Sequence, residues 1–527
     1  MVSGTDPPPL GSPTDNNGPT RREQSSAIHV CFAWPWPHLT NTLHYTTLFK
    51  HLSRPRAQLK TKLNHTEPML RTRLAARCAP NIIAKRSMAM AAAVAPVHTQ
   101  ITKLTNGITV ATEHDPSATA SSIGLVFGSG STAENPYNNG VSNLSTHLFS
   151  KNNNLTKLAN ENDFQLNSHV ARDYQSYMVS SLPGQQGKVF QFLQKNLIEA
   201  KLDEPTFNYE KQLCEQQTAI FENTQHATRV MEHLHSTAFQ NTPLSLPTRG
   251  TVETLQTLTT SDLQYFTQNN FKASNAVVVG TGNIPHEELL QAVEDNLQLA
   301  PGEKQVSKTK STFLGSEVRL RDDTLPKAWI SIAVEGEPMN SPNYYTAQVA
   351  AQIFGQYNAF EPRSRLQGIK LLDNLQEYGL CDSFDHFNLS YKDSGLWGFS
   401  TVTRNVGSID DLIHFTLKQW NRLTISITNT ELARGKSLLK LKLANENSNN
   451  VSNLQRANLL GESIVNTGTK HNLQEIFNKI DSITVKDIKA WAGERVWDQD
   501  IAIAGTGQIE GLLDYMRIRN DMSMMRW

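Results

Sequence analysis

The sequence predicts an α+β fold made of two homologous halves, because one pattern occurs in it twice. The segment around Asp262 and Gly280-Thr-Gly282 recurs around Asp487 and Gly505-Thr-Gly507, 225 residues further along the chain. In both copies an amphipathic helix is followed by a short apolar strand and then by a glycine turn. A constant spacing that preserves both the apolar positions and the glycines indicates an internal duplication.

Each half also opens with residues typical of β-strands. The strands are expected within residues 101–112 and 123–127 of the first half, and 318–320 and 329–334 of the second. Residues 301–315 between them are polar and rich in turn-forming residues, which is typical of a linker. The predicted organisation is therefore an N-terminal half over residues 88–300, a linker over 301–315 and a C-terminal half over 316–527.

The region before the first half has a different composition. Residues 1–68 contain nine of the 23 prolines and show no sustained helical or strand period, so we expect a disordered upstream extension. The stretch from Met69 to Thr112 contains no Asp or Glu but several Arg and Lys, which is typical of a mitochondrial presequence. We expect that presequence over residues 69–87, with a mature N-terminus near Met88. The alternative is a basic surface tail.

Composition excludes several classes of function. Lys and Arg together number 49, as do Asp and Glu, so the chain has no overall basic field that would favour nucleic acid as a partner. The four cysteines lie far apart without a CxxC pair, which argues against a disulfide framework and against a cysteine zinc site. The longest apolar run, from Met88 to Val97, is much shorter than the roughly 18 to 20 residues of a membrane-spanning helix.

The two Gly-Thr-Gly segments follow strands, as the glycines of a dinucleotide-binding turn do. The third glycine of that fingerprint is replaced by Pro285 in one copy and by Glu510 in the other, and no series of alternating strands and helices surrounds either. Tight turns that need a positive φ explain both copies better. A nucleotide-binding protein therefore remains only a minor alternative.

One motif connects the chain to a family of enzymes. The segment from Asn138 to His147 lies where pitrilysin-type metallopeptidases, including mitochondrial processing peptidase, carry the inverted zinc motif H-x-x-E-H. The body of the chain resembles that superfamily. From Met69 onward it is more closely similar to the core subunits of fungal mitochondrial ubiquinol cytochrome c reductase, respiratory complex III. The most specific segments are residues 111–117, 127–130, 134–143, 233–250, 325–330, 394–400 and 514–519.

The resemblance assigns the positions of the zinc site residue by residue. The first histidine ligand becomes Asn143, the glutamate that acts as general base becomes Thr146, and the second histidine is kept as His147. The distal glutamate ligand is best matched by Gln217, with Glu215 as a close alternative. A carboxamide and a hydroxyl are poor zinc ligands, and Thr146 has no pKa near neutrality with which to accept a proton from water. We therefore expect no zinc and no hydrolysis.

Two further histidines lie close together in the sequence. His233 and His235 are two residues apart on a predicted helix, so their side chains project about 200° from each other and cannot chelate one ion. We expect them to serve in packing and polar contacts.

The resemblance implies a structural role. Such a subunit pairs with core protein 2 and supports cytochrome b, cytochrome c1 and the iron-sulfur subunit, on the matrix side of the mitochondrial inner membrane and without a transmembrane helix. It is not an enzyme, and no haem, iron-sulfur, quinone or metal site is expected on it. The alternative is a subunit of a zinc-dependent mitochondrial processing peptidase. The non-catalytic partner in that enzyme uses a glycine-rich loop, but residues 351–366 contain only one glycine.

Overall fold

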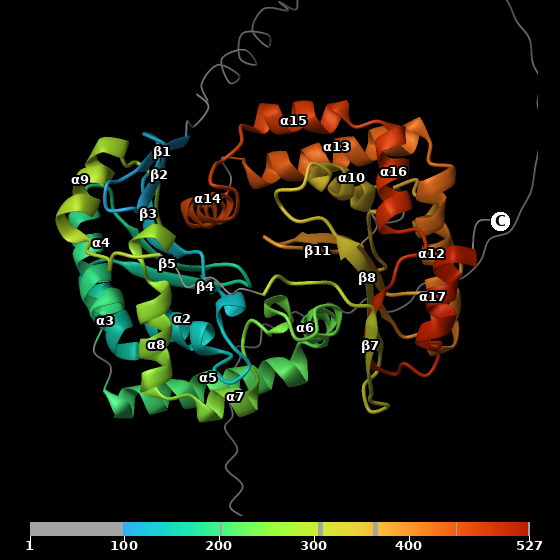
Figure 1. The fold of residues 1–527 in the computed structure, drawn as a ribbon, viewed down its shortest axis with the longest axis horizontal. Helices are drawn as coiled ribbons and strands as arrows, with labels where there is room; N and C mark the ends of the chain where they lie inside the picture. Colours follow the sequence, from blue (N-terminus) through green and yellow to red (C-terminus); the bar gives the residue numbers. More distant parts are fainter. Residues whose placement is uncertain (1–98, 201–202, 304–308, 362–366, 449–450, 525–527) are drawn as a thin grey trace, which may run out of the picture. The chain divides into compact units, whose positions relative to one another are not determined.

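The computed structural model describes residues 99–200, 203–303, 309–361, 367–448 and 451–524 (Figure 1). The expected extension over residues 1–68, the expected presequence over 69–87 and the expected start near Met88 lie outside the described residues, as does the middle of the expected linker, 304–308.

The first half contains a six-stranded sheet with the order β1-β2-β6-β3-β5-β4. Its last strand in sequence, β6, lies in the middle of the sheet, parallel to β2 and antiparallel to β3. The other pairs are antiparallel. The strands are β1 (Thr99–Lys103), β2 (Thr109–His114), β3 (Ser121–Phe127), β4 (Gln165–Val170), β5 (Gln175–Ser181) and β6 (Ala276–Gly282).

The second half repeats this topology with the order β7-β12-β8-β11-β10-β9. Strand β12 takes the place of β6, since it is parallel to β7 and antiparallel to β8. The strands are β7 (Ser316–Arg321), β8 (Ala328–Gly336), β9 (Gln356–Asn358), β10 (Ser383–Ser390), β11 (Gly395–Thr403) and β12 (Ala502–Gly507). The expected α+β fold with two homologous halves is confirmed.

The repeated segment has the same local structure in both halves. Helices α8 (Thr260–Asn270) and α16 (Val485–Arg495) each begin with a capping box, in which a threonine hydroxyl accepts the amide of the residue three positions on and the aspartate at that position accepts in return. The glycines that end the following strands, Gly282 and Gly507, have φ values of 102° and 88°. Both turns therefore need a glycine for its backbone conformation, as predicted.

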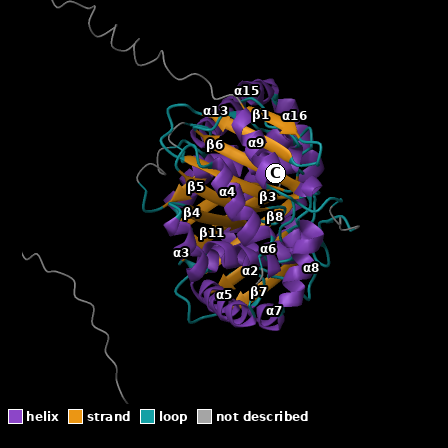
Figure 2. Cartoon of the chain, turned by 90° about the vertical axis from the view of Figure 1, so that its left-hand side faces the viewer, coloured by secondary structure: helices purple, strands orange, loops and turns teal. Residues whose placement is uncertain are grey.

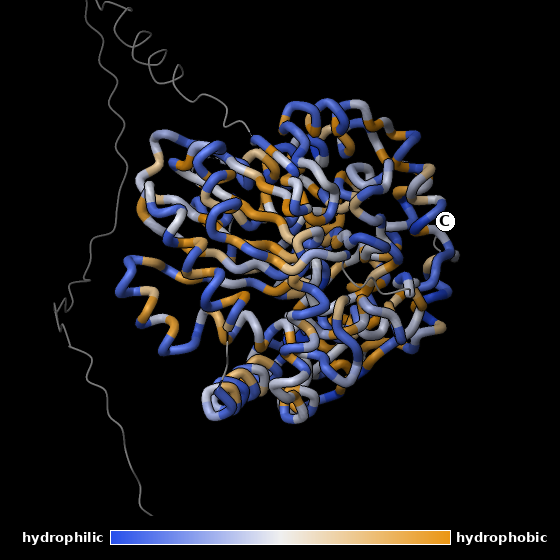
Figure 3. Tube along the Cα trace, turned by 60° about the vertical axis from the view of Figure 1, so that its left-hand side comes forward, coloured by the Kyte–Doolittle hydropathy of each residue, from blue (hydrophilic) through white to orange (hydrophobic). Residues whose placement is uncertain are grey.

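Helices cover both faces of each sheet. On one face of the first sheet lie helices of the same half, including α4 and α9, which are seen over the strands in Figure 2. Hydrophobic residues gather along the strands, while the outer turns of the helices are mainly hydrophilic (Figure 3). The helices of the first half are α2 (Val141–Ser150), α3 (Asn153–Glu161), α4 (Gln186–Leu193), α5 (Glu204–Thr224), α6 (His226–Ala238), α7 (Val252–Thr257), α8 and α9 (His286–Asn296).

The remaining helices belong to the second half. They are α10 (Tyr344–Phe354), α11 (Lys370–Glu377), α12 (Ile409–Ile425), α13 (Asn429–Glu446), α14 (Asn453–Thr467), α15 (Leu473–Ser482), α16 and α17 (Tyr515–Met524). Short 3-10 or π turns occur at Ser131–Ala133, Gln194–Ile198, Pro243–Ser245, Ala273–Asn275 and Val406–Ser408. Within the part of the chain that the structure describes, no helix combines the length and the apolar character needed to cross a bilayer.

The two halves exchange one helix each. Helix α14 of the second half packs on the outer face of the first sheet, where Leu460 and Ile464 contact a cluster that contains Val126 and Val279. Helix α6 of the first half packs in the same way on the second sheet, against β8 and β12. Each half therefore completes the core of the other. The division of the chain at residues 301–315 stays a prediction. It describes the order of the two halves along the sequence, whereas in space α6 and α14 each pack on the sheet of the other half.

Candidate functional site

Helix α2, which carries the degenerate motif, begins at a buried carboxylate. Glu134 accepts hydrogen bonds from the amides of Gly140 (2.8 Å) and Ser142 (2.7 Å), from the Ser142 hydroxyl (2.5 Å) and from the Asn139 side chain (2.7 Å). A carboxylate at a helix N-terminus satisfies free amides and lies at the positive end of the helix dipole. Burial raises the pKa of Glu134 to about 7, against the effect of these four donors.

Helix α5 supplies the opposite wall. Its buried residues are Phe207, Glu210, Cys214 and Thr218, whose spacing of three and four places them on one face of the helix. This face lies against α2. We call this region of contact, with Asn143, Thr146 and His147 on one side and Glu210 and Cys214 on the other, the α2–α5 cleft, because it carries the motif of the peptidase active site.

The side chain of Asn143 makes two hydrogen bonds. Its side-chain amide donates to the sulfur of Cys214 at 3.3 Å and to the carbonyl of Arg249 at 3.2 Å. The hydroxyl of Thr146 donates to the carbonyl of Asn143 at 2.8 Å, within its own helix. The position that carries the general base in the active peptidases thus holds a hydroxyl bonded to its own helix backbone.

At the centre of the cleft, His147 lies opposite Glu210. The ring nitrogen Nδ1 is 3.4 Å from Glu210 Oε2, and both side chains are less than 5% exposed. Burial, with a smaller effect of the nearby Lys151 charge, lowers the pKa of His147 to about 4. The imidazole is therefore neutral at pH 7, and the contact is not an ion pair there. Neither ring nitrogen has a hydrogen-bond partner among the described residues.

The two candidates for the distal ligand lie elsewhere on α5. Gln217 is exposed, and its side-chain oxygen accepts a hydrogen bond from Lys151 Nζ at 2.7 Å. Glu215 accepts one from the Gln256 side chain at 2.6 Å, which turns it toward α7. The residues that the structure brings to His147 and Asn143 are instead Glu210 and Cys214. Sequence reasoning missed both, because the buried face of α5 includes the polar residues Glu210 and Thr218 and therefore leaves no apolar stripe in the sequence.

These residues do not fit the zinc site of the active peptidases. Burial raises the pKa of the Cys214 thiol to about 11, so that it stays protonated, whereas zinc binds the thiolate. Asn143 and Thr146 offer only neutral oxygen and nitrogen atoms. Among the residues that the structure describes, no group of three His, Cys, Asp or Glu side chains is arranged to hold a metal ion. The assignment of Gln217 as the distal position remains a prediction.

The histidines of α6 lie away from this cleft. His235 is buried, with Nδ1 2.6 Å from the carbonyl of Met231 and Nε2 2.7 Å from the hydroxyl of Tyr391 in the second half. The expected packing and polar role is confirmed for His235. His233 is half-buried on another side of the helix.

The sequence matches two family models. The model described as insulinase (peptidase family M16) covers residues 109–252, and that described as peptidase M16 inactive domain covers 257–439. The chain is 64% identical to the mitochondrial cytochrome b-c1 complex subunit 1 of Saccharomyces cerevisiae, over 84% of this chain and 97% of that protein.

More distant relatives include both complex III subunits and peptidase subunits. The mitochondrial-processing peptidase subunit beta of Neurospora crassa is 35% identical, over 81% of this chain and 91% of that protein. Among solved structures, a chain of "Complex III2 from Candida albicans, Inz-5 bound" matches with a TM-score of 0.75 and 38% identity, over 81% of this chain and all of that chain.

These matches confirm the resemblance seen in the sequence. Identity to the yeast complex III subunit is nearly twice that to the peptidase subunit, over almost the whole length of both relatives. The chain belongs to the insulinase (M16) peptidase family, in the group that contains subunit 1 of the mitochondrial cytochrome b-c1 complex.

Proposed function

We propose that this chain is a non-catalytic core subunit of the mitochondrial cytochrome b-c1 complex, needed for the assembly and stability of the complex that passes electrons from ubiquinol to cytochrome c. The observation that carries the proposal is the 64% identity to subunit 1 of that complex over nearly its full length. The α2–α5 cleft supports it, because Asn143 and Thr146 replace groups that zinc hydrolysis requires.

The proposed location is the matrix side of the mitochondrial inner membrane, as a peripheral subunit. Its partners are core protein 2, which it contacts through their shared two-lobed fold, together with cytochrome b, cytochrome c1 and the iron-sulfur subunit. A subunit of this kind provides contact surfaces for its partners and does not catalyse a reaction. Obligate interfaces bury roughly 2,000 to 5,000 Å² and resemble a protein core, so partner binding should stabilise the folded chain strongly.

The second candidate is a subunit of a zinc-dependent mitochondrial processing peptidase, which the 35% identity to the Neurospora crassa beta subunit favours. A deletion strain separates the two. Loss of the chain should abolish assembled complex III on native gels while imported precursors are still processed. A strain with normal complex III and accumulated precursors would show the peptidase function instead.

A complementation series sharpens this experiment. Asn143→Ala and Thr146→Ala should each restore complex III to the level of the unmodified chain, because neither residue has a catalytic task. The Leu460→Ala variant serves as the structural control and should restore less, because Leu460 is fully buried where the two halves meet. If Asn143→Ala or Thr146→Ala fails to restore complex III although the protein is present at its normal level, the cleft has a function, which would contradict the proposal.

A further inference from the structure

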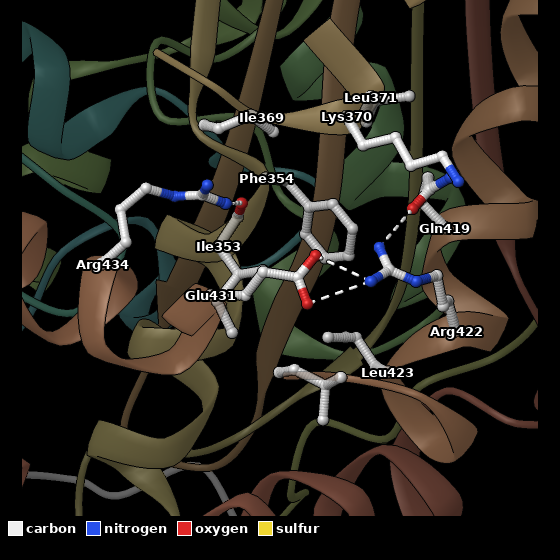
Figure 4. A pocket seen from close by; sticks show the side chains of 11 residues that line it. Ile353, Phe354, Ile369, Lys370, Leu371, Gln419, Arg422, Leu423, Glu431 and Arg434 are labelled. Carbon is white, nitrogen blue, oxygen red and sulfur yellow. Dashed lines mark hydrogen bonds and ion pairs between the residues drawn. The ribbon is translucent and has the colours of Figure 1, made fainter. Parts of the chain in front are cut away.

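A small pocket lies in the second half, far along the chain from the α2–α5 cleft. It is formed by the end of α10, the start of α11, the end of α12 and the start of α13 (Figure 4). Its floor is apolar and firmly packed, since Phe354, Ile369 and Leu423 are at most 3% exposed. The cavity volume of about 20 Å³ offers room for one or two water-sized groups. We call it the α12–α13 pocket.

Three cations and one acid line the pocket: Lys370, Arg422, Arg434 and Glu431. The acid is already neutralised. Arg422 lies 2.9 Å from Glu431 Oε1, and the amide and hydroxyl of Thr428 donate to Oε2 at 2.9 and 2.7 Å. Burial raises the pKa of Glu431, but these hydrogen bonds and the Arg422 charge outweigh it and hold the pKa below its ordinary value. Glu431 therefore cancels Arg422 and leaves two positive charges.

One of the remaining charges is Arg434. Its guanidinium donates to the backbone carbonyls of Gly368 (2.8 Å) and Ile353 (3.2 Å), and its Nε is buried without a hydrogen-bond partner among the described residues. No carboxylate of the described residues forms an ion pair with it. Neutral carbonyls hold the group in place but do not compensate its charge, and an unpaired buried donor costs roughly 1 to 3 kcal/mol.

The other remaining charge is Lys370, which is exposed at the mouth of the pocket and has no ion-pair partner among the described residues. In Figure 4, Lys370 and Arg422 lie on one side of the Phe354 ring and Arg434 lies on the other. The Glu431 carboxylate, which is bonded to Arg422, lies between the two arginines, so an incoming anion would be attracted by the uncompensated charges of Lys370 and Arg434. This arrangement suits a single anionic group.

We propose that the α12–α13 pocket docks a carboxylate of an acidic segment on a neighbouring polypeptide, through the uncompensated charges of Lys370 and Arg434. A planar carboxylate matches the donors of an arginine, and the small cavity suits a single carboxyl group better than a nucleotide or a lipid headgroup. The neighbour is a further subunit of the assembly, so this identification of the partner rests on the proposed function.

The chemistry of the pocket is tested on the purified full-length chain. The probe is a fluorescein-labelled peptide of alternating Glu and Leu, and the matched probe replaces each Glu by Gln. Fluorescence anisotropy at low salt should show at least tenfold weaker binding for the Gln peptide, and an equal loss for Lys370→Glu. Lys418→Glu is the control, because Lys418 is an exposed residue of α12 that does not line the pocket; it should change affinity less than twofold. Equal losses for both lysine variants, or equal binding of both peptides, would overturn the proposal.

The partner is tested in the assembled complex by zero-length coupling. A water-soluble carbodiimide activates a carboxylate, and the Lys370 amine then displaces the urea to form an amide. Mass spectrometry should find Lys370 joined to an Asp or Glu of another polypeptide. Coupling of Lys370 only within its own chain, the terminal carboxylate included, or no coupling at all, would overturn the docking proposal. Absence of the chain from the purified complex would instead overturn the proposed function.

Discussion

The α2–α5 cleft and the interface between α14 and the first sheet differ in how well their buried polar groups are hydrogen-bonded. In the cleft, His147 and Glu210 are buried at 3.4 Å without a charge pair at neutral pH, and neither ring nitrogen of His147 has a hydrogen-bond partner among the described residues. At the interface, contacts are short. The Ser176 hydroxyl donates to the Asn458 side chain at 2.8 Å.

The interface continues this pattern along α14. The Thr281 hydroxyl donates to the carbonyl of Asn453 at 2.7 Å, and the Asn453 side chain donates to the carbonyl of Ala120 at the same distance. Buried polar groups without partners lower stability, whereas paired ones are close to neutral or favourable. The comparison shows that several contacts joining the halves are short hydrogen bonds, whereas both ring nitrogens of His147 in the former peptidase cleft are buried without a hydrogen-bond partner among the described residues. Mutations should therefore be felt most strongly at the interface.

The largest effect is expected for Leu460→Ala in α14. Leu460 is fully buried against the first sheet, and removal of such a side chain costs about 2 to 5 kcal/mol of unfolding free energy. Denaturant unfolding followed by circular dichroism measures it. The control is Leu459→Ala, since the neighbouring side chain is 40% exposed and should cost under about 1 kcal/mol. Equal losses would mean that α14 does not depend on its packing against the sheet.

A smaller loss of unfolding free energy is expected for Gly461→Ala in the same helix. Alanine favours a helix by about 1 kcal/mol over glycine. At this position, however, a Cβ would lie 2.5 Å from Val126 Cγ2, which has no space to move in the core. We expect a net destabilisation of about 1 to 3 kcal/mol.

The matched control is Gly493→Ala in α16, where a Cβ would meet nothing within 4 Å. That variant should raise the free energy of unfolding by up to about 1 kcal/mol. If both glycine variants stabilise the protein, the close approach of α14 to the sheet is not a constraint.

The buried titratable groups at the cleft should make the free energy of unfolding depend on pH. Burial holds the pKa of His147 near 4 in the folded chain, below its ordinary 6.5 in the unfolded chain. The unfolded state then binds the proton more strongly, so stability is lost as pH falls from about 6.5 toward 4. Glu134 acts in the opposite direction, since its raised pKa reduces stability as pH rises toward 7.

The difference between the unmodified chain and His147→Gln isolates the histidine. The variant should lose about 2 to 3 kcal/mol less of its unfolding free energy between pH 6.5 and 4, measured by denaturant unfolding at each pH. His414→Gln, which removes an exposed histidine of α12, serves as the control variant. Identical profiles for all three proteins would mean that His147 is free to take up a proton in the folded state.

The smallest effect is expected from an attempt to restore the peptidase motif. The double variant Asn143→His with Thr146→Glu should still contain no stoichiometric zinc by elemental analysis and should cleave no presequence peptide. The reason is that Gln217 is bonded to Lys151 and the Cys214 thiol stays protonated. One zinc per chain would show that Glu215, Glu210 or Cys214 serves as the third ligand, and adding Glu215→Gln, Glu210→Gln or Cys214→Ala would then identify which.

The prediction of the fold from the sequence succeeded where the signal is local. The strands at residues 101–112 and 329–334 appear as β1 with β2 and as β8, although the first stretch is broken by a turn at Gly107, whose φ is 96°. The site could be predicted only in part. Asn143, Thr146 and His147 lie on one helix and are recognisable by their spacing, whereas the residues of α5 that face them depend on how two helices pack.

The sequence by itself determined that the chain is a duplicated α+β protein with a damaged zinc motif. Apolar periodicity, capping residues and glycines at positive φ act over a few residues, so they can be read along the chain. Only the tertiary structure decided that α14 and α6 cross to the opposite sheets, and that Glu210 and Cys214 lie against the motif. These contacts join residues tens to hundreds of positions apart, and their partners are selected by the burial of complementary apolar faces, which no local pattern specifies.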